Sequence, residues 1–461
     1  MPIHVEGGEL RVEGKGHDSG SSGLLRSTLH PLLSTGMLAA LLAAAACSAE
    51  DWPQWRGPTH DAASPEKGLN FAWPAEGPKQ FWKASVGKGA SAPIVCGGRV
   101  YAMGNDGSPA PKVEKKTPPA GTEAIKPEAD PPKVQSDHDT LYCFDAESGK
   151  ELWKFGYDCP LHVLSDAGGP NATPACDGKL VFTLSKAGQI HCLDAEKGAL
   201  VWAHDLFKDK EDIRKKVLIW GGIASSPLLS GGQVIFNSVA LEKATGKVKY
   251  ELPGASRWVS PTPLKVNGLD AAVVYMQAHK GSGLMAFQPE SGKEVWRVNM
   301  KLGSGDPLIF EGKCFVSGRA GNEDGSRLYD LPKDGAAAGQ PLESPPLWQA
   351  DDKAKGEGSY WGNAVRVGEF VFSGEDKALV CRDLKTGEVK GSFKAENVQP
   401  LAVDGKLLVH ACNGQVLVFE AAAEMKLLVK AQVLPGGKFS ILPALAQGRL
   451  YVKNSNGDLV C

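Results

Sequence analysis

The residues best suited to chemistry stand just ahead of four short phrases, NATPA, ASSP, VSPTP and GNAV. They combine aromatic rings with a guanidinium, an imidazole and a carboxylate, and they are Trp220, Arg257, Trp258, Tyr360, Trp361, His162 and Asp166. Rings and a cation that converge on one mouth can stack a planar ligand or anchor a loop of a partner protein. The alternative is that they only pack between structural units and close a channel. We call this set the candidate funnel surface.

Other motifs for catalysis, cofactors or metals are either absent from this sequence or lack the context that they require. The stretch GKGASA at 87–92 matches a dinucleotide fingerprint, but such a site requires a helix next, and Pro93 follows instead. P-loop, HExxH, GxSxG, CxxC and CxxCH patterns are absent, and His162, His191 and His279 lack the spacing of metal ligands. The sequence therefore predicts no catalytic residue and no metal site.

Composition favours a single large all-β protein. The chain has 461 residues, of which 42% are hydrophobic and 23% are charged, with a formal net charge of −2. This near-neutral balance gives no basic face for nucleic acid. The 55 glycines and 31 prolines, with few helical patterns, indicate many short strands joined by turns.

The N-terminus is typical of an export signal. Residues 31–49 form an apolar run that follows Arg26 and ends in small residues, and the run is too short for a membrane span. We expect cleavage after Ala49, with lipidation at Cys47 as the alternative. Residues 1–30 are expected to be disordered, so 1–49 is a leader and 50–461 is the folded domain, located in the periplasm or at the outer membrane.

A turn followed by an apolar strand occurs eight times in the folded domain. In most copies the turn glycine follows Asp, Asn or Gly, which is the chemistry of a tight hairpin. The turn glycines are Gly98, Gly178, Gly232, Gly268, Gly312, Gly368, Gly405 and Gly448. One interval is longer than the others because it contains 107–138, a Pro/Lys/Glu-rich insert that cannot bury enough apolar surface to fold.

A second phrase, DAESGKELW in its clearest copy, closes most units and ends in a bulky residue. The two phrases together give four antiparallel strands per unit of about 47 residues, which favours a β-propeller. We expect the bulky residues to wedge between neighbouring blades. They are Trp82, Trp153, Trp202, Tyr250, Trp296, Trp348 and Phe393.

The last unit stops at Cys461, where its third strand should run, and it lacks the closing phrase. The segment KQFWKA at 79–84 is a closing phrase without a beginning, so it can supply the missing fourth strand. Joining the two ends in one sheet removes the free edges of an open array. The sequence thus predicts eight blades in a ring that is closed by an N-terminal strand.

The same positions resemble the pyrroloquinoline quinone (PQQ)-like repeat with its tryptophan-docking motif, A-x-D-x-x-T-G-x-x-x-W. The resemblance covers about residues 78–461, with the best copies at 143–153 and 192–202. The phrase DWPQWRGP at 51–58 resembles the start of many exported PQQ-like propeller proteins of planctomycete-type bacteria. As evidence of activity the resemblance is weaker, because one fold hosts many functions.

Two roles follow from this resemblance. BamB-like propellers bind envelope proteins, which implies a non-catalytic scaffold that engages envelope proteins or a small ligand and takes part in outer-membrane protein assembly. Quinoprotein dehydrogenases of alcohols or sugars hold PQQ and Ca²⁺ on the propeller axis. Their adjacent cysteine pair is absent here, and their carboxylate and amide set is not found in this sequence. We therefore expect the binding role, with no cofactor assigned, and keep the dehydrogenase as the alternative.

Overall fold

The computed structural model describes residues 51–461 with several gaps. The residues left out of this description within that range are 75, 108–137, 160, 162–167, 220, 237, 253, 279–280, 301–304, 318–324, 334–341, 351–362 and 376. The predicted leader and export signal, with Cys47, therefore lie outside the described residues. So does nearly all of the predicted insert, although His138 already belongs to a strand.

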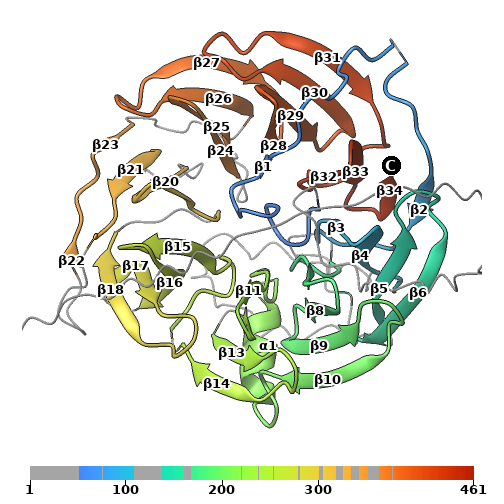
Figure 1. Cartoon of the computed structure of the whole chain (residues 1–461), viewed down its shortest axis with the longest axis vertical. Coiled ribbons are helices and arrows are strands. Elements are labelled where there is room, and N and C mark those ends of the chain that lie inside the picture. The colour runs from blue at the N-terminus through green and yellow to red at the C-terminus, as the bar shows by residue number, and fades with distance from the viewer. Residues whose placement is uncertain are drawn as a thin grey trace, which may run out of the picture. The chain divides into compact units, whose positions relative to one another are not determined.

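Eight β-sheets follow one another around a ring, which confirms the all-β, eight-bladed propeller (Figure 1). Each sheet has four antiparallel strands, and two sheets gain a fifth strand. The four strands follow one another in the chain, except that β22 (Leu342–Glu343) intervenes between β21 (Arg327–Asp330) and β23 (Trp348–Gln349) and that β2 (Lys83–Ser85) belongs to the last sheet. The described part of the chain has a single α-helix, α1 (Glu211–Ile219), between the second and third blades. Within the described residues, this helix is not long and apolar enough to cross a membrane.

In the first four blades the strands follow the chain from the inner strand outward. Blade 1 contains β3 (Ile94–Cys96), β4 (Arg99–Asn105), β5 (His138–Asp145) and β6 (Glu151–Asp158). Blade 2 contains β7 (Ala175–Cys176), β8 (Leu180–Leu184), β9 (Gln189–Asp194) and β10 (Leu200–Asp205). Blade 3 contains β11 (Leu228–Ser230), β12 (Gln233–Phe236), β13 (Val239–Glu242) and β14 (Val248–Glu251). Blade 4 contains β15 (Thr262–Val266), β16 (Leu269–Ala278), β17 (Gly281–Phe287) and β18 (Glu294–Asn299), with β22 (Leu342–Glu343) added outside.

The remaining blades complete the ring. Blade 5 contains β19 (Leu308–Phe310), β20 (Lys313–Val316), β21 (Arg327–Asp330) and β23 (Trp348–Gln349). Blade 6 contains β24 (Ala364–Val367), β25 (Phe370–Glu375), β26 (Ala378–Asp383) and β27 (Val389–Lys394). Blade 7 contains β28 (Val398–Val403), β29 (Lys406–Ala411), β30 (Gln415–Glu420) and β31 (Leu427–Gln432), with β1 (Ala63–Ser64) added inside. Blade 8 contains β32 (Ala444–Ala446), β33 (Arg449–Lys453), β34 (Asp458–Val460) and β2 (Lys83–Ser85).

The two-residue turns follow from local backbone chemistry. Between β28 and β29, Asp404 and Gly405 have φ angles of 49° and 69°. Both therefore adopt the left-handed region that a tight hairpin turn requires, and Asp and Gly tolerate this region better than most residues.

Neighbouring blades are joined by an aromatic ring that lies flat on a glycine of the next blade. A Cβ placed on Gly149 or Gly198 would come within 2.4–2.5 Å of the indole of Trp82 or Trp153, respectively. The indole N–H of Trp82 also donates to the carbonyl oxygen of Ala146 at 3.1 Å. Trp202, Tyr250 and Trp348 make the same two kinds of contact with the following blade.

Two of the predicted wedges differ from this pattern. Trp296 is buried, but its indole nitrogen is without a hydrogen-bond partner among the residues that the structure describes. Phe393 cannot donate a hydrogen bond and instead packs edge-to-face on Phe419, with ring centroids 4.9 Å apart. The wedge position is thus common to these blades, while its hydrogen bond is not.

The N-terminal segment 51–64 ties the inner strands of several blades together, and in Figure 1 it lies at the centre of the ring. Trp52 forms a β-bridge with Val95 of blade 1. The carbonyl oxygen of Pro53 accepts from Cys176 of blade 2 at 2.9 Å. β1 pairs in parallel with β28 of blade 7. These contacts place the segment on the propeller axis.

Four cysteines occupy the same repeat position on the third strand of their blades or just after it. Cys143, Cys192, Cys381 and Cys461 are free thiols and are all buried. Burial raises the pKa of the first three to about 12, so these thiols stay protonated and pack as small apolar groups.

Candidate functional site

The residue at or just before the start of the inner strand of each blade recurs at one position in the sequence. In seven of the eight blades this residue directly precedes a proline, which has no backbone N–H to satisfy and favours an extended conformation in its predecessor. In blade order the eight residues are Ala92, Thr173, Ser226, Ser260, Asp306, Asn363, Gln399 and Leu442. We call them the axial ring.

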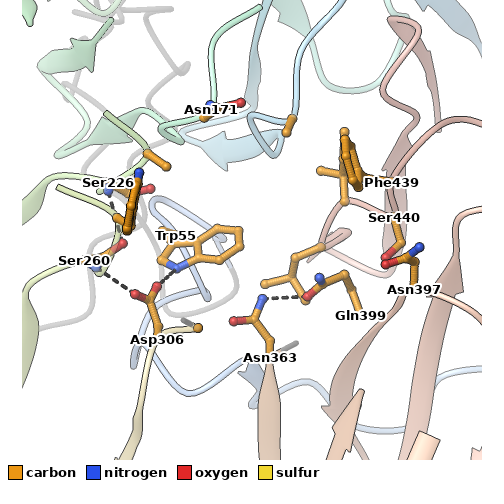
Figure 2. Close-up of a pocket in the computed structure, with 16 residues that line it drawn as sticks. Trp55, Asn171, Ser226, Ser260, Asp306, Asn363, Asn397, Gln399, Phe439 and Ser440 are labelled. Atoms are coloured by element: carbon orange, nitrogen blue, oxygen red, sulfur yellow. Dashed lines mark hydrogen bonds between the residues drawn. The ribbon is translucent and has the colours of Figure 1, made fainter. Parts of the chain in front are cut away.

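A pocket of about 110 Å³ lies where the axial ring converges (Figure 2). Every blade contributes at least one residue to its lining, and six members of the axial ring contact it. The N-terminal segment contributes Trp55, whose indole lies among the surrounding side chains. Trp258 and Phe439 supply two further aromatic rings. We call this cavity the axial pocket.

A chain of hydrogen bonds runs from blade to blade through five members of the axial ring. The backbone N–H of Ala92 donates to Thr173 Oγ1 at 3.1 Å, and that of Thr173 donates to Ser226 Oγ at 3.0 Å. The N–H of Ser226 donates to Ser260 Oγ at 3.1 Å, and that of Ser260 donates to Asp306 Oδ1 at 2.7 Å. This axial hydrogen-bond chain ends on the carboxylate of Asp306, which is a stronger acceptor than the three hydroxyl groups before it.

Asp306 is the one ionisable residue among the described residues that line the axial pocket. Its second oxygen, Oδ2, accepts the indole N–H of Trp55 at 2.5 Å, so the carboxylate holds the ring in place (Figure 2). Burial raises the pKa of the Asp306 carboxyl above its usual value, while the hydrogen bond from Ser260 and the charge of Arg56 act in the opposite direction.

Arg56 supports the pocket from the N-terminal segment without contributing to the lining. Its guanidinium is buried and donates to the carbonyl oxygen of Pro307 at 3.1 Å and to that of Ala364 at 2.7 Å. It therefore connects blades 5 and 6 and fixes the segment that carries Trp55.

The next two members of the axial ring present amides. The side-chain NH₂ of Asn363 donates to Gln399 Oε1 at 2.6 Å. This bond leaves the carbonyl oxygen of Asn363 on the side of Asp306 (Figure 2). Asp306, Asn363 and Gln399 form a polar arc over blades 5 to 7, whereas Ile441 and Leu442 of blade 8 give the pocket an apolar side.

The structure places two of the seven residues of the candidate funnel surface. Trp258 lines the axial pocket, and the guanidinium of Arg257 lies over its ring, 4.6 Å from the centroid. On another blade, Lys438 lies in the same way over Phe439, at 5.3 Å. The other five predicted residues, His162, Asp166, Trp220, Tyr360 and Trp361, lie outside the described residues.

Sequence reasoning missed most of the pocket. Trp55, Asp306, Asn363 and Gln399 were not among the predicted site residues. The available signal was the repeated residue before proline, in SAP, ATP, SSP, VSP, GDP, VQP and ILP, which marks one position in seven of the eight blades. Trp55 lies outside the repeats, and its one signal was the phrase DWPQWRGP at 51–58, which assigns no role to the residue.

PQQ does not fit the described lining of this pocket. The quinone is a fused tricycle that carries three carboxylates, and it requires compensating positive charge. The described lining supplies one carboxylate and neither Lys, Arg nor His. The residues that the structure describes also contain no group of three or more His, Cys, Asp or Glu placed to hold a metal ion. A cavity of about 150 Å³ holds benzene, so the volume here is also small for three fused rings.

Comparison with known proteins shows which proteins part of this chain is similar to. The family model described as outer membrane protein assembly factor BamB matches residues 137–306. BamB of Burkholderia pseudomallei is 27% identical over 282 residues, covering 58% of this chain and 55% of that protein. The quinoprotein alcohol dehydrogenase PedH of Pseudomonas putida is 26% identical over 245 residues, covering 49% of this chain and 39% of that protein. The chain thus spans about half or less of the length of these relatives.

Solved structures agree on the fold alone. The quinohemoprotein alcohol dehydrogenase of Comamonas testosteroni superposes with a TM-score of 0.56 at 12% identity, over 89% of this chain and 80% of that one. A europium-containing methanol dehydrogenase gives a TM-score of 0.56 at 13% identity, over 88% of this chain and 89% of that one. Together with the eight blades and their docking aromatics, these matches show that the chain is a β-propeller, and its repeats are similar to those of the assembly factor BamB over residues 137–306.

Proposed function

We propose that this protein is a non-catalytic binding module of the bacterial cell envelope, exported to the periplasm or the outer membrane. Its partner engages the face of the ring on which the axial pocket opens. The observation that carries this proposal is the pocket itself, to which all eight blades contribute and which is lined by rings, amides, hydroxyls and one carboxylate. Such a lining recognises a ligand by stacking and hydrogen bonding.

The chemistry of the described lining supports binding over catalysis. General acid–base or nucleophilic catalysis uses two or more reactive groups within hydrogen-bond reach of one another. Asp306 is instead bonded to Trp55 and to the backbone of Ser260, and both contacts fix its position. The likeness to BamB supports an envelope protein as the partner and a role in outer-membrane protein assembly.

The pocket predicts where a partner makes contact. We would place a photoreactive amino acid at Phe439, which lines the pocket, and at Val248, which is exposed on the outer strand β14. After irradiation in the producing bacterium, we expect a discrete protein adduct from the first position and none from the second. Trp258→Ala should abolish the adduct at Phe439. Equal labelling from both positions would contradict the proposal.

The dehydrogenase alternative is tested on the purified protein. The protein would be titrated with PQQ and Ca²⁺ and assayed for dye-linked oxidation of alcohols and sugars. Saturable uptake of the quinone together with turnover would replace the binding role with the dehydrogenase role.

A further inference from the structure

We propose that the axial pocket binds an organic cation, an ammonium or guanidinium group, which stacks on the indole face of Trp55 beside the carboxylate of Asp306. This inference rests on the proposed binding function, for which it names the chemical class of the ligand. The cation belongs either to a small molecule or to a lysine or arginine side chain of a partner protein.

The charge of the pocket favours a cation. Asp306 is acidic, and the described lining contains no basic residue. Both hydrogen bonds to its carboxylate come from neutral donors, the indole of Trp55 and the backbone of Ser260. An ionised carboxylate offers about four acceptor positions, so these two bonds leave capacity on the pocket side. The buried guanidinium of Arg56 bonds to backbone carbonyls of blades 5 and 6, and its charge lowers the pKa of Asp306, which favours the ionised carboxylate.

The geometry of Trp55 favours a cation over a neutral ligand. Tryptophan has the strongest cation–π attraction of the aromatic side chains. Its N–H donates to a carboxylate, and a hydrogen bond to an anion shifts electron density toward the ring. The negative face of this indole is therefore enhanced next to a fixed negative charge.

Two other rings of the pocket already follow this pattern within the chain. Arg257 lies over Trp258 and Lys438 lies over Phe439, with the cations 4.6 Å and 5.3 Å from the ring centroids. Among the described residues no cation of the chain lies over Trp55.

The size and polarity of the cavity set the shape of that head. A volume of about 110 Å³ is close to that of a cavity that holds benzene, and it suits a trimethylammonium or guanidinium group. Asp306 and Asn363 present oxygens on one side, and Leu442 presents an apolar surface on the other. A cation with hydrocarbon attached matches both sides.

The experiment compares ligands that differ only in charge. Choline and its neutral isostere 3,3-dimethylbutan-1-ol would be titrated into the full chain by calorimetry, with tryptophan fluorescence as a second readout. A blocked peptide of four glycines around one arginine represents the side-chain source. We expect choline or the peptide to bind at least about tenfold more tightly than the isostere, which corresponds to one desolvated cation–π contact. Whichever cation binds better identifies the source.

Variants locate the site. Asp306→Asn keeps the shape of the side chain but removes its charge and one of its two acceptor oxygens, so we expect the affinity for the cation to fall at least about tenfold. Asp330→Asn, on the exposed side of β21 in the same blade, is the matched control and should change affinity less than about twofold. Circular dichroism and the unfolding midpoint verify the fold of each variant. If Asp306→Asn does not fold, the choline–isostere comparison on the unchanged protein still decides.

Failure of this inference is distinguishable from failure of the proposed function. Equal affinity for choline and its isostere, or tighter binding of glucose than of any cation, overturns the cation assignment. In that case a Trp258-dependent crosslink at Phe439 leaves the binding role intact. Absence of both the crosslink and any binding overturns both proposals.

Discussion

The backbone N–H of Cys461 donates a hydrogen bond of 3.0 Å to the carbonyl oxygen of Trp82, so the last residue of the chain is bonded to a residue near the start of the ring. Next to this contact, Phe81 N–H donates to the carbonyl oxygen of Cys461 at 2.8 Å, and Lys83 pairs with Val460. Blade 8 thus takes its outer strand from the N-terminal end of the ring.

Trp82 should therefore stabilise the whole ring. Trp82→Ala removes a buried indole and its bond to Ala146, and we expect a loss of about 3–5 kcal/mol in the free energy of unfolding. Phe81→Ala is the matched control, because the neighbouring ring is 50% exposed and should cost about 1 kcal/mol or less. Urea unfolding measures both variants. Similar losses for the two would contradict the closing role of Trp82.

The glycine under each docking ring is predicted to be required for close approach. Gly198 and Gly405 have similar φ angles of 67° and 69°, so alanine is strained at both positions. A Cβ on Gly198 would come within 2.5 Å of the Trp153 ring, whereas a Cβ on Gly405 has nothing within 4 Å. Gly198→Ala should cost at least about 1–3 kcal/mol more than Gly405→Ala, by thermal or urea unfolding. Equal costs would mean that only backbone strain matters.

The contribution of an indole hydrogen bond to the free energy of unfolding can be measured by comparing Trp202 with Trp296. The indole of Trp202 donates to the carbonyl oxygen of Lys243 at 2.8 Å, whereas that of Trp296 has no hydrogen-bond partner in the described part of the chain. Trp202→Phe leaves a carbonyl unpaired, and Trp296→Phe removes an unsatisfied N–H. We expect Trp202→Phe to be more destabilising by about 1 kcal/mol in urea unfolding. The reverse order would show that ring packing alone decides.

The axial hydrogen-bond chain offers a comparison between adjacent serines. Ser226 Oγ accepts from Thr173 N–H, while the buried hydroxyl of Ser225 has no hydrogen-bond partner among the described residues. Ser226→Ala leaves a buried N–H unpaired and should lower the free energy of unfolding by about 1–3 kcal/mol. Ser225→Ala should be close to neutral. Destabilisation by Ser225→Ala comparable to that of Ser226→Ala would argue against the chain as a stabilising element.

Buried histidines predict that mild acid destabilises the protein. Burial lowers the pKa of His60 to about 3 and that of His191 and His410 to about 4, from 6.5. Above pH 6.5 these residues are neutral in both states and have no effect. Below pH 6.5 the unfolded chain takes up protons that the folded chain does not, so stability falls until the pH reaches the folded-state pKa values.

This acid effect can be assigned to a single residue. Each histidine contributes up to about 1.4 kcal/mol per pH unit between pH 6.5 and its folded-state pKa. His410→Gln should therefore reduce the slope of unfolding free energy against pH by that amount in urea titrations between about pH 6 and pH 5. An unchanged slope would show that His410 is accessible to protons in the folded state.

The number of blades was readable from the sequence because its signals are local. A tight turn such as Asp404-Gly405 depends on backbone conformations that few residues tolerate, and in blades 1 to 4 the docking aromatic follows a glycine of its own blade at a fixed distance along the chain. Two wedges have their predicted place but not the docking hydrogen bond: the indole nitrogen of Trp296 has no partner among the described residues, and Phe393 has no donor.

The sequence by itself thus determined the repeat, the fold and the number of blades, because each unit carries its own turn and packing residues. Only the tertiary structure decided what occupies the axis. Trp55 and Asp306 are bonded to each other, yet they come from a segment outside the repeats and from blade 5. No local pattern encodes their contact, because it exists only after the ring has closed and brought the inner ends of all eight blades together.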